Sequence, residues 1–247
     1  MPARFPCIAV ALFVAAFILS AKTPDEFGKR VAVGITSGTD GFGITAGTVY
    51  GDHIGFRTGL TFLPQFLGTT VPVTVKGPIP GMPDESHPFR VEPNSSFYHV
   101  FLDVYPSSRS DFRLTVGMFG SEGEQAVRMM SRDRFPSVGG FTPLCFEADL
   151  PMILPYAGIG AGRLVRKGGR LQVGFDIGVA WKGHGRIRAS NAPGSSGGIL
   201  LDTDDLRELD SRMKDPLCKV TGKGLLLWFS ETRLLPVFRL NVTWRIL

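Results

Sequence analysis

The sequence predicts an all-β protein, specifically an eight-stranded antiparallel up-and-down transmembrane β-barrel with one short helix in its last long loop. Three observations lead to this prediction. Several segments alternate apolar and polar residues with a period of two, which places successive side chains on opposite faces of a strand. The polar faces of these segments carry small residues, and short and long connections between the segments follow one another regularly.

The alternation is clearest in the last segment, residues 236–247, and is repeated in residues 170–181. The apolar face of the last segment holds Phe238, Leu240, Val242, Trp244 and Ile246, and its polar face holds Arg239, Asn241, Thr243 and Arg245. The earlier segment carries Leu171, Val173, Phe175, Ile177, Val179 and Trp181 on one face and Gln172, Gly174, Asp176, Gly178 and Ala180 on the other. Both segments are therefore predicted to be long strands with two distinct faces.

The polar faces indicate which side of the barrel faces inward. A lipocalin-like barrel in water points its apolar face inward, whereas an outer-membrane barrel points that face at lipid. A water-facing exterior is usually rich in Lys and Glu, but these faces carry Gly, Ala, Gln, Thr, Asn and a few Arg and Asp. Such residues suit a narrow lumen, so a lipid-facing apolar exterior is favoured and a soluble lipocalin-like binder is the alternative.

The N-terminus has the pattern of a secretory signal. Arg4 precedes an apolar run from Cys7 to Leu19, and Ser20 and Ala21 supply small residues for cleavage. Residues 1–21 are therefore predicted to be a signal peptide, and residues 22–247 the barrel. A membrane anchor is the alternative, but the run is shorter than the roughly 20 residues that a spanning helix needs.

Length and charge narrow the classes further. The chain of 247 residues allows one sizeable domain or two small ones. Its net charge of +5 is not gathered into a basic stripe, so no nucleic-acid partner is predicted. After the signal, no segment approaches about 18 consecutive apolar residues, so only a closed barrel could carry the mature chain through a membrane.

The remaining strands follow in order. They are predicted at residues 31–36, 42–50, 54–62, 96–105, 112–118 and 155–164. The first is short for a span of about 9 to 11 residues. Residues 63–95, 121–153 and 182–235 are predicted to be long loops, the last with a short helix from Asp202 to Met213 that has acids in its first turn and ends before Pro216.

The lengths of the connections fit one topology. Those after the second, fourth and sixth strands are short, while those after the third, fifth and seventh are long. Bacterial outer-membrane barrels have short periplasmic turns and longer outer loops. Both ends of the barrel chain are then expected on the periplasmic side, with a short outer loop after the first strand.

The polar faces gather charged residues that are predicted to share the lumen. This lumen polar cluster comprises Arg57, His99, Asp103, Arg113, Asp176, Arg239 and Arg245. It could form a polar site or narrow conduit, or an ion-pair network that fills the interior. Eight strands leave room only for side chains or one small ligand, which favours the network and argues against a general diffusion porin.

Cys145 and Cys218 are the cysteines outside the signal, and both are placed in outer loops. In an oxidising compartment they are candidates for a disulfide, with two unpaired thiols as the alternative. No metal site or cofactor is predicted. The Gly158–Gly162 segment lacks the capped helix and ribose-binding acid of a dinucleotide site, and small lumen residues explain it better.

Trp181 and Trp244 are expected to anchor opposite membrane interfaces, with ordinary packing as the alternative. Catalysis is not expected. A lipid hydrolase would need a Ser activated by His and an orienting acid, and beyond Ser96, three residues from His99, nothing suggests such a triad.

Short motifs resemble a family of small Gram-negative outer-membrane β-barrel proteins with an eight-stranded, OmpA/OmpW-like architecture. They are Val33-Gly34-Ile35, Asp103-Val104-Tyr105-Pro106, Phe112-Arg113-Leu114, Pro155-Tyr156-Ala157-Gly158, Phe175-Asp176-Ile177-Gly178-Val179 and Leu235-Pro236-Val237. The resemblance implies the cell outer membrane as location, and it brings no established catalytic residues. Its implied partners are outer-membrane lipids and, during insertion, the barrel-assembly machinery.

Two features depart from that family. The chain ends Arg245-Ile246-Leu247 where an aromatic terminal residue is common, and the insert with Leu225 to Phe229 is longer than expected. That segment could be a plug, an interfacial segment or part of an extended strand. The favoured function is a structural or surface-interaction role, and the alternatives are a narrow channel or small-ligand transport barrel and a lipid-modifying enzyme.

Overall fold

The computed structural model describes residues 31–63, 68–75, 85–93, 95–121, 127–131, 135–137, 140–142, 145–165, 170–190, 199–215 and 223–246. The predicted signal peptide, Cys218 and Pro216 lie outside these ranges. Among the helices described, none combines the length and the apolar character that crossing a membrane requires.

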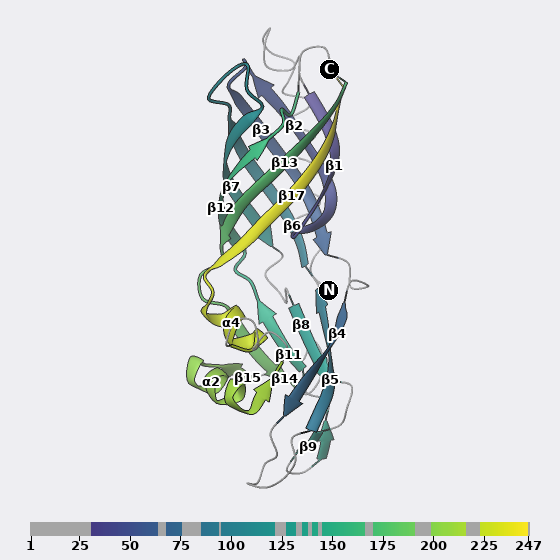
Figure 1. Ribbon diagram of the computed structural model, residues 1–247, viewed down its shortest axis with the longest axis vertical. Helices are drawn as coiled ribbons and strands as arrows, with labels where there is room; N and C mark the ends of the chain where they lie inside the picture. The colour runs from purple at the N-terminus through teal and green to yellow at the C-terminus, as the bar shows by residue number, and fades with distance from the viewer. Residues whose placement is uncertain are drawn as a thin grey trace.

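Eight strands form a closed antiparallel barrel, the upper body in Figure 1. They are β1 (Val31–Gly38), β2 (Gly41–Tyr50), β3 (Ile54–Leu63), β6 (Ser95–Val104), β7 (Phe112–Ser121), β12 (Ile153–Ala161), β13 (Leu171–Trp181) and β17 (Leu234–Arg245). Their order around the barrel is β1-β17-β13-β12-β7-β6-β3-β2, so each barrel strand pairs with the next along the chain and β1 closes against β17. The prediction of eight up-and-down antiparallel strands is confirmed, and β1 is longer than expected.

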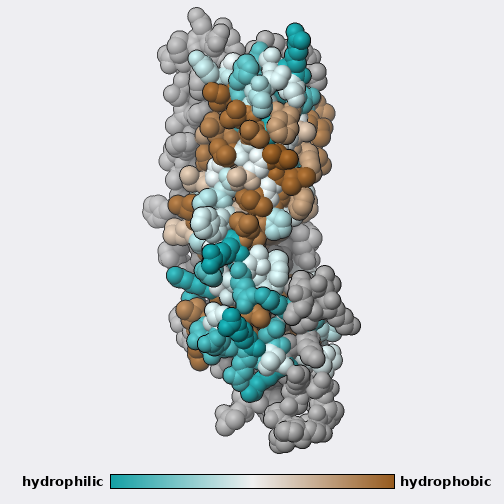
Figure 2. Space-filling view, turned by 60° about the vertical axis from the view of Figure 1, so that its left-hand side comes forward, coloured by the Kyte–Doolittle hydropathy of each residue, from teal (hydrophilic) through white to brown (hydrophobic). Residues whose placement is uncertain are grey.

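The alternation in the sequence corresponds to the two faces of this barrel. On β17, Phe238, Leu240 and Trp244 are exposed, while Arg239, Asn241 and Thr243 are buried. The same holds on β13, where Phe175 and Ile177 are exposed and Asp176 is buried. Figure 2 shows the resulting band of hydrophobic side chains over the barrel, above a mostly hydrophilic region. The apolar residues therefore lie outside and the polar residues inside.

The two ends of the barrel differ. Residues 51–53, 105–111 and 162–170 connect strands at the end where β17 finishes, here called the turn end. The three long connections and the two-residue turn at Thr39 and Asp40 lie at the opposite end, here called the mouth. Gly41 and Gly162 have φ of 102° and 98°, values that L side chains rarely adopt, which explains glycine at these strand ends.

The three long connections, predicted as loops with one short helix in the last, also contain the strands of a second sheet, so the prediction of loops is wrong for those parts. It comprises β4 (Thr69–Val75), β5 (Glu85–Pro93), β8 (Val127–Ser131), β11 (Cys145–Asp149), β14 (Arg186–Ser190), β15 (Ile199–Leu201) and β16 (Met213–Lys214). In space the order is β15-β14-β11-β8-β5-β4-β16, and we call it the cap sheet. β9 (Phe135–Ser137) and β10 (Gly140–Thr142) form a separate hairpin. Five of the seven cap strands have five residues or fewer, and the two longer ones, β4 and β5, are interrupted where Pro72 pairs with Pro88, so no sustained alternation marks them.

Two helices accompany the cap sheet. α2 (Thr203–Arg212) confirms the predicted helix, and the Asp202 carboxylate caps it by accepting hydrogen bonds from the amides of Asp204 and Asp205 at 2.9 and 2.8 Å. α4 (Leu225–Glu231) was not predicted as a helix, and the extended-strand alternative for this segment is wrong. Asp215 Oδ2 accepts from the amide of Leu225 at 2.7 Å, so a carboxylate satisfies a free donor at its start.

One continuous hydrophobic cluster joins the barrel to the cap. It comprises Phe97, Phe101, Phe119 and Tyr156 inside the barrel, Leu150, Leu154, Ala180, Phe229 and Val237 at the mouth, and Val73, Phe89, Met129, Phe146, Ala148, Ile187, Leu206 and Leu227 in the cap. Because the cluster has no polar break, the cap sheet and the barrel mouth share a core.

The register at the closing seam can be tested with paired cysteines. Ile35 lies opposite Val242, while Leu240 lies opposite Ser37. Directly opposite Cβ atoms are about 5 Å apart and diagonal ones about 7 to 8 Å, and a disulfide requires about 4 Å. We expect Ile35→Cys with Val242→Cys to cross-link readily on oxidation. The matched pair Ile35→Cys with Leu240→Cys should cross-link poorly, and a reversed preference on non-reducing gels would disprove this register.

Candidate functional site: the barrel interior and its mouth

A network of buried charges fills the middle of the barrel around Asp176 of β13. Its carboxylate accepts from Arg57 Nη1 at 2.8 Å, from Arg113 Nη2 at 2.8 Å and from Asn241 Nδ2 at 2.8 Å. β3, which carries Arg57, is four strands from β13 in either direction around the barrel. The Arg57–Asp176 pair therefore crosses the lumen and joins opposite walls.

Asp103 of β6 completes this network. Its carboxylate lies 2.6 Å from Arg57 Nε and accepts from Thr115 Oγ1 at 2.7 Å. Two aspartates thus balance the two arginines Arg57 and Arg113, and each of the four residues is no more than 2% exposed. We call Arg57, Asp103, Arg113 and Asp176 the Asp176 network. It is electrically neutral, which is the condition under which buried charges persist.

Glycines on β12 and β13 make room for the network. A Cβ on Gly160 would come within 2.4 Å of Asp176 Oδ1 and 2.9 Å of Arg113 Nε, and one on Gly174 within 3.2 Å of Arg113 Nη2. The small residues of these polar faces are therefore required by the large charged side chains opposite them.

A second polar group lies between this network and the mouth. Arg239 Nε is 3.2 Å from Asp40 Oδ2, which also accepts from Thr61 Oγ1 at 3.0 Å. Arg239 Nη2 lies 3.2 Å from His99 Nδ1 on the opposite wall. The guanidinium also sits 5.2 Å from the ring centroid of Phe101, a cation–π arrangement. Arg239 therefore braces the barrel at a second level.

Aromatic rings surround Arg239. His99 stacks on Phe101 with centroids 4.9 Å apart, Phe101 meets Phe119 edge-on at 5.2 Å, and Tyr156 lies 4.8 Å from Phe101. This aromatic lumen cluster of Phe97, Phe101, Phe119 and Tyr156 was not predicted from the sequence. Every second residue of a strand lies on the same face. Counting by twos from His99 reaches Phe97 and Phe101, and counting from Thr115 reaches Phe119, so these three rings could have been placed inside the barrel.

The turn end is held together by Arg163. Its guanidinium donates to the carbonyls of Ser107 at 2.6 Å and Asp52 at 3.1 Å, and its Nε donates to that of Ser110 at 3.2 Å. These carbonyls belong to the other two turns at this end. The side chain also lies 4.9 Å from the Tyr105 ring centroid. One residue thus ties the three turns together, and the sequence analysis did not single it out.

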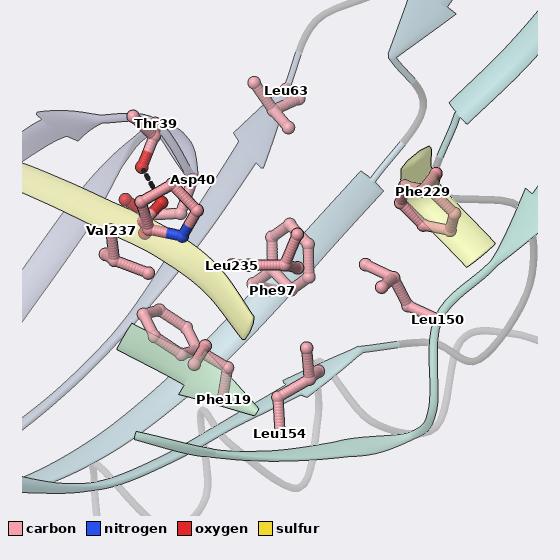
Figure 3. A pocket seen from close by; sticks show the side chains of 12 residues that line it. Thr39, Asp40, Leu63, Phe97, Phe119, Leu150, Leu154, Phe229, Leu235 and Val237 are labelled. Carbon is pink, nitrogen blue, oxygen red and sulfur yellow. Dashed lines mark hydrogen bonds between the residues drawn. The ribbon is translucent and has the colours of Figure 1, made fainter. Parts of the chain in front are cut away.

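α4 lies at one side of the mouth, where its Phe229 lines a cavity (Figure 3). Phe229 of α4 and Leu150 face Phe97 and Leu154 of the barrel across a cavity. Lys182, which follows β13, donates from Nζ to the carbonyl of Phe229 and lies 4.3 Å from its ring centroid. Burial lowers the pKa of Lys182 to about 8. α4 is therefore fastened to the end of β13.

The other predicted site residues are distributed as follows. Arg245 lies opposite Ala32 at the turn end, half-buried and beyond the Asp176 network. Trp181 and Trp244 are both exposed, at opposite ends of β13 and β17. Ser96 is exposed whereas His99 is buried, so their side chains lie on opposite faces of β6.

Cys145 is buried on β11 in the cap sheet, and no other described residue forms a disulfide with it. Its thiol has a raised pKa because of burial. Cys218 lies outside the described residues, so a pairing of these cysteines stays a prediction. Within the described ranges, no group of three or more His, Cys, Asp or Glu side chains is arranged to hold a metal ion.

The fold and interior define a class, a closed eight-stranded barrel with a filled lumen and a folded cap. No protein-family model matches the sequence, and no curated protein matches it either. Two solved structures are similar, both from Acinetobacter baumannii. CarO2 has 14% sequence identity and a TM-score of 0.48 over 87% of this chain and 98% of CarO2. CarO has 12% identity and a TM-score of 0.48 over 87% of this chain and 97% of CarO.

Asp176→Asn should destabilise the barrel strongly. The substitution removes the charge that Arg57 and Arg113 share and leaves two buried guanidinium groups with one remaining aspartate, at a cost of about 3 to 5 kcal/mol. Urea unfolding of the purified protein, followed by gel mobility, measures the change. Asp204→Asn on exposed α2 is the matched control and should shift the midpoint little. Equal midpoints for the two variants would refute the central role of Asp176.

Lys182 should make stability depend on pH above about 8. The folded-state pKa of about 8 lies below the ordinary value of 10.5, so between these values the unfolded chain binds a proton that the folded chain releases. Stability attributable to Lys182 therefore rises as pH increases through this window, and the full cost of burying the charge applies below it. Urea unfolding of wild type and of Lys182→Met at pH 7, 9 and 10.5 measures this effect. The free energy of unfolding of wild type, relative to that of the variant, should increase from pH 7 to pH 10.5. A pH-independent difference would contradict this assignment.

Proposed function

We propose that this protein is an outer-membrane β-barrel with a structural or surface-interaction role, which seals its own lumen and displays the cap sheet outside the membrane. The observation that carries the proposal is the combination of an apolar exterior with a buried, neutral charge network across the lumen. Catalysis plays no part in it.

The exterior supports embedding in lipid. Exposed apolar side chains occur on all eight barrel strands, among them Ile35, Ile44, Phe62, Leu102, Val116, Ile159, Val173 and Leu240. A soluble protein rarely exposes an apolar band that encircles it, whereas lipid-facing strands require one. Outer-membrane lipids are therefore the proposed partners of this surface, with Trp181 and Trp244 anchoring the two interfaces.

The interior argues against a conduit. Arg57 reaches Asp176 across the lumen, Arg239 reaches His99 at a second level, and Arg163 ties the turn end. An ion crossing the barrel would have to displace buried charges that are already paired. The narrow-channel alternative therefore has less support than the filled barrel.

The cap supports a role at the cell surface. Short turns lie on the periplasmic side of bacterial outer-membrane barrels and long connections outside, which supports a cap sheet that faces the outside of the cell. The barrel then serves as its membrane foundation. Insertion is expected to need the barrel-assembly machinery, although the chain ends in Leu247 rather than in an aromatic residue.

Fractionation and conductance test this proposal together. The full chain should be recovered in the outer membrane, migrate as a compact band until boiled, and shift on heating. Reconstituted in planar bilayers, it should show no stable conductance steps, because the lumen is filled. A protein recovered in the periplasm would indicate a soluble ligand-binding barrel, and reproducible conductance steps from heat-modifiable protein would support the channel alternative.

A further inference from the structure

The cavity at the mouth is a candidate ligand site that goes beyond the proposed structural role and does not depend on it. Its volume is about 190 Å³. Its lining residues are Thr39, Asp40, Leu63, Phe97, Phe119, Leu150, Leu154, Ala180, Phe229, Leu235, Pro236 and Val237. They come from six barrel strands, from the β1–β2 turn, from the β11–β12 connection and from α4, so the barrel and its cap line the cavity together (Figure 3).

The short β1–β2 hairpin leaves space for this cavity. The pairing of β1 with β17 ends at Gly38 and Arg239, whereas β17 continues to Leu234 beside β13. On the other side, β3 continues to Leu63. The barrel wall therefore ends earlier at the β1–β2 hairpin than at the neighbouring strands β17 and β3. Asp40 of the hairpin faces the cavity, because no further strand residues of β1 and β2 lie there.

Thr39 and one carboxylate oxygen of Asp40 are engaged elsewhere, whereas Asp40 Oδ1 is buried without a hydrogen-bond partner. Thr39 Oγ1 donates to the carbonyl of Pro236 at 3.3 Å and accepts from the amide of Phe238 at 3.1 Å. Asp40 Oδ2 is held by Thr61 and Arg239. Asp40 Oδ1 is buried beside Gly38, where a Cβ would lie 2.9 Å from it. The lining therefore offers no free charge, since Arg239 neutralises Asp40.

Size and chemistry select the occupant. An apolar cavity of about 150 Å³ can hold benzene, so the space at this mouth matches one substituted aromatic ring. Phe97 and Phe119 are arranged edge-to-face with centroids 6.2 Å apart, and aromatic ligands add favourably to such pairs. A charged ligand would lose its hydration without gaining a counter-charge.

We propose that the mouth cavity binds a small uncharged aromatic molecule, of single-ring size, between the Asp40–Arg239 pair and Phe229 of α4. Phe229 of α4 forms one side of the site, and Lys182 holds it there by its contacts with the Phe229 carbonyl and ring. The ligand contacts side chains of the barrel and of the cap at once, and therefore binds only when both are folded.

Binding can be measured on the full chain in detergent by fluorine NMR with 4-fluorotoluene, 4-fluorobenzylammonium and 4-fluorobenzoate. We expect saturable binding of 4-fluorotoluene and much weaker binding of both charged probes. Absence of saturable binding by 4-fluorotoluene overturns the site. Equal affinity of either charged probe overturns the proposed class of ligand.

A pair of matched variants locates the bound probe. Ala180 lines the cavity, whereas Ala157, one rung away on β12, is exposed on the outer face. Ala180→Leu fills the cavity and should weaken binding by at least about tenfold, or about 1.4 kcal/mol, while Ala157→Leu should leave it unchanged. Equal binding by the two variants would place the probe in the detergent or elsewhere on the protein and overturn the proposal.

A third variant keeps the test decisive if Ala180→Leu fails to fold. Leu154→Ala enlarges the cavity from within the same strand as Ala157. It should shift preference from 4-fluorotoluene towards the larger 1-fluoronaphthalene in heat-modifiable protein. An unchanged preference would show that the probe does not occupy this cavity.

Discussion

The ion pair between Arg57 and Asp176 spans the barrel from one wall to the opposite wall, and the rest of the interior is arranged around it. A charge in this lumen is separated from bulk water, so each guanidinium needs an acid and each acid needs donors. Asp103 supplies the second acid, Thr115 and Asn241 supply donors, and Gly160 and Gly174 supply space. Buried ion pairs contribute little net stability compared with apolar packing; their effect here is to fix the distance between walls and to occupy the lumen.

Much of the barrel could be predicted from the sequence because a two-residue period is a local signal. Residues 170–181 and 236–247 each carry the period over a whole span, and β13 and β17 lie there. Asp103, Arg113 and Asp176 could be assigned to the lumen because they alternate with apolar residues along their strands. Their partners could not be, because pairing across a barrel depends on the tilt and stagger of strands that lie far apart in the chain.

The cap could not be predicted for a related reason. Its central strands β5, β8, β11 and β14 come from three different connections. β8, β11 and β14 have five residues each, which is too short to show a period, and β5 is interrupted by Pro88. Phe89, Phe146 and Ile187 form its core only when those connections lie side by side. α4 was missed because Leu225 to Phe229 is apolar throughout, and a short apolar run does not distinguish helix from strand. The mouth, where cap and barrel share one core, could not be predicted for both reasons: its contacts join segments far apart in the chain, and its cap segments show no period.

The closing seam has a consequence for how the chain folds. Thr39 contacts Pro236 across 197 residues of sequence, so the first hairpin must wait for the last strand before the circle can close. That strand also delivers Arg239 to Asp40 and Asn241 to Asp176. Until β17 pairs, Asp40 lacks its ion pair with Arg239, Asp176 lacks its hydrogen bond from Asn241, and one edge of β1 is unpaired. Contacts between segments so far apart in the chain slow folding, and the edge of β1 stays exposed until β17 pairs with it.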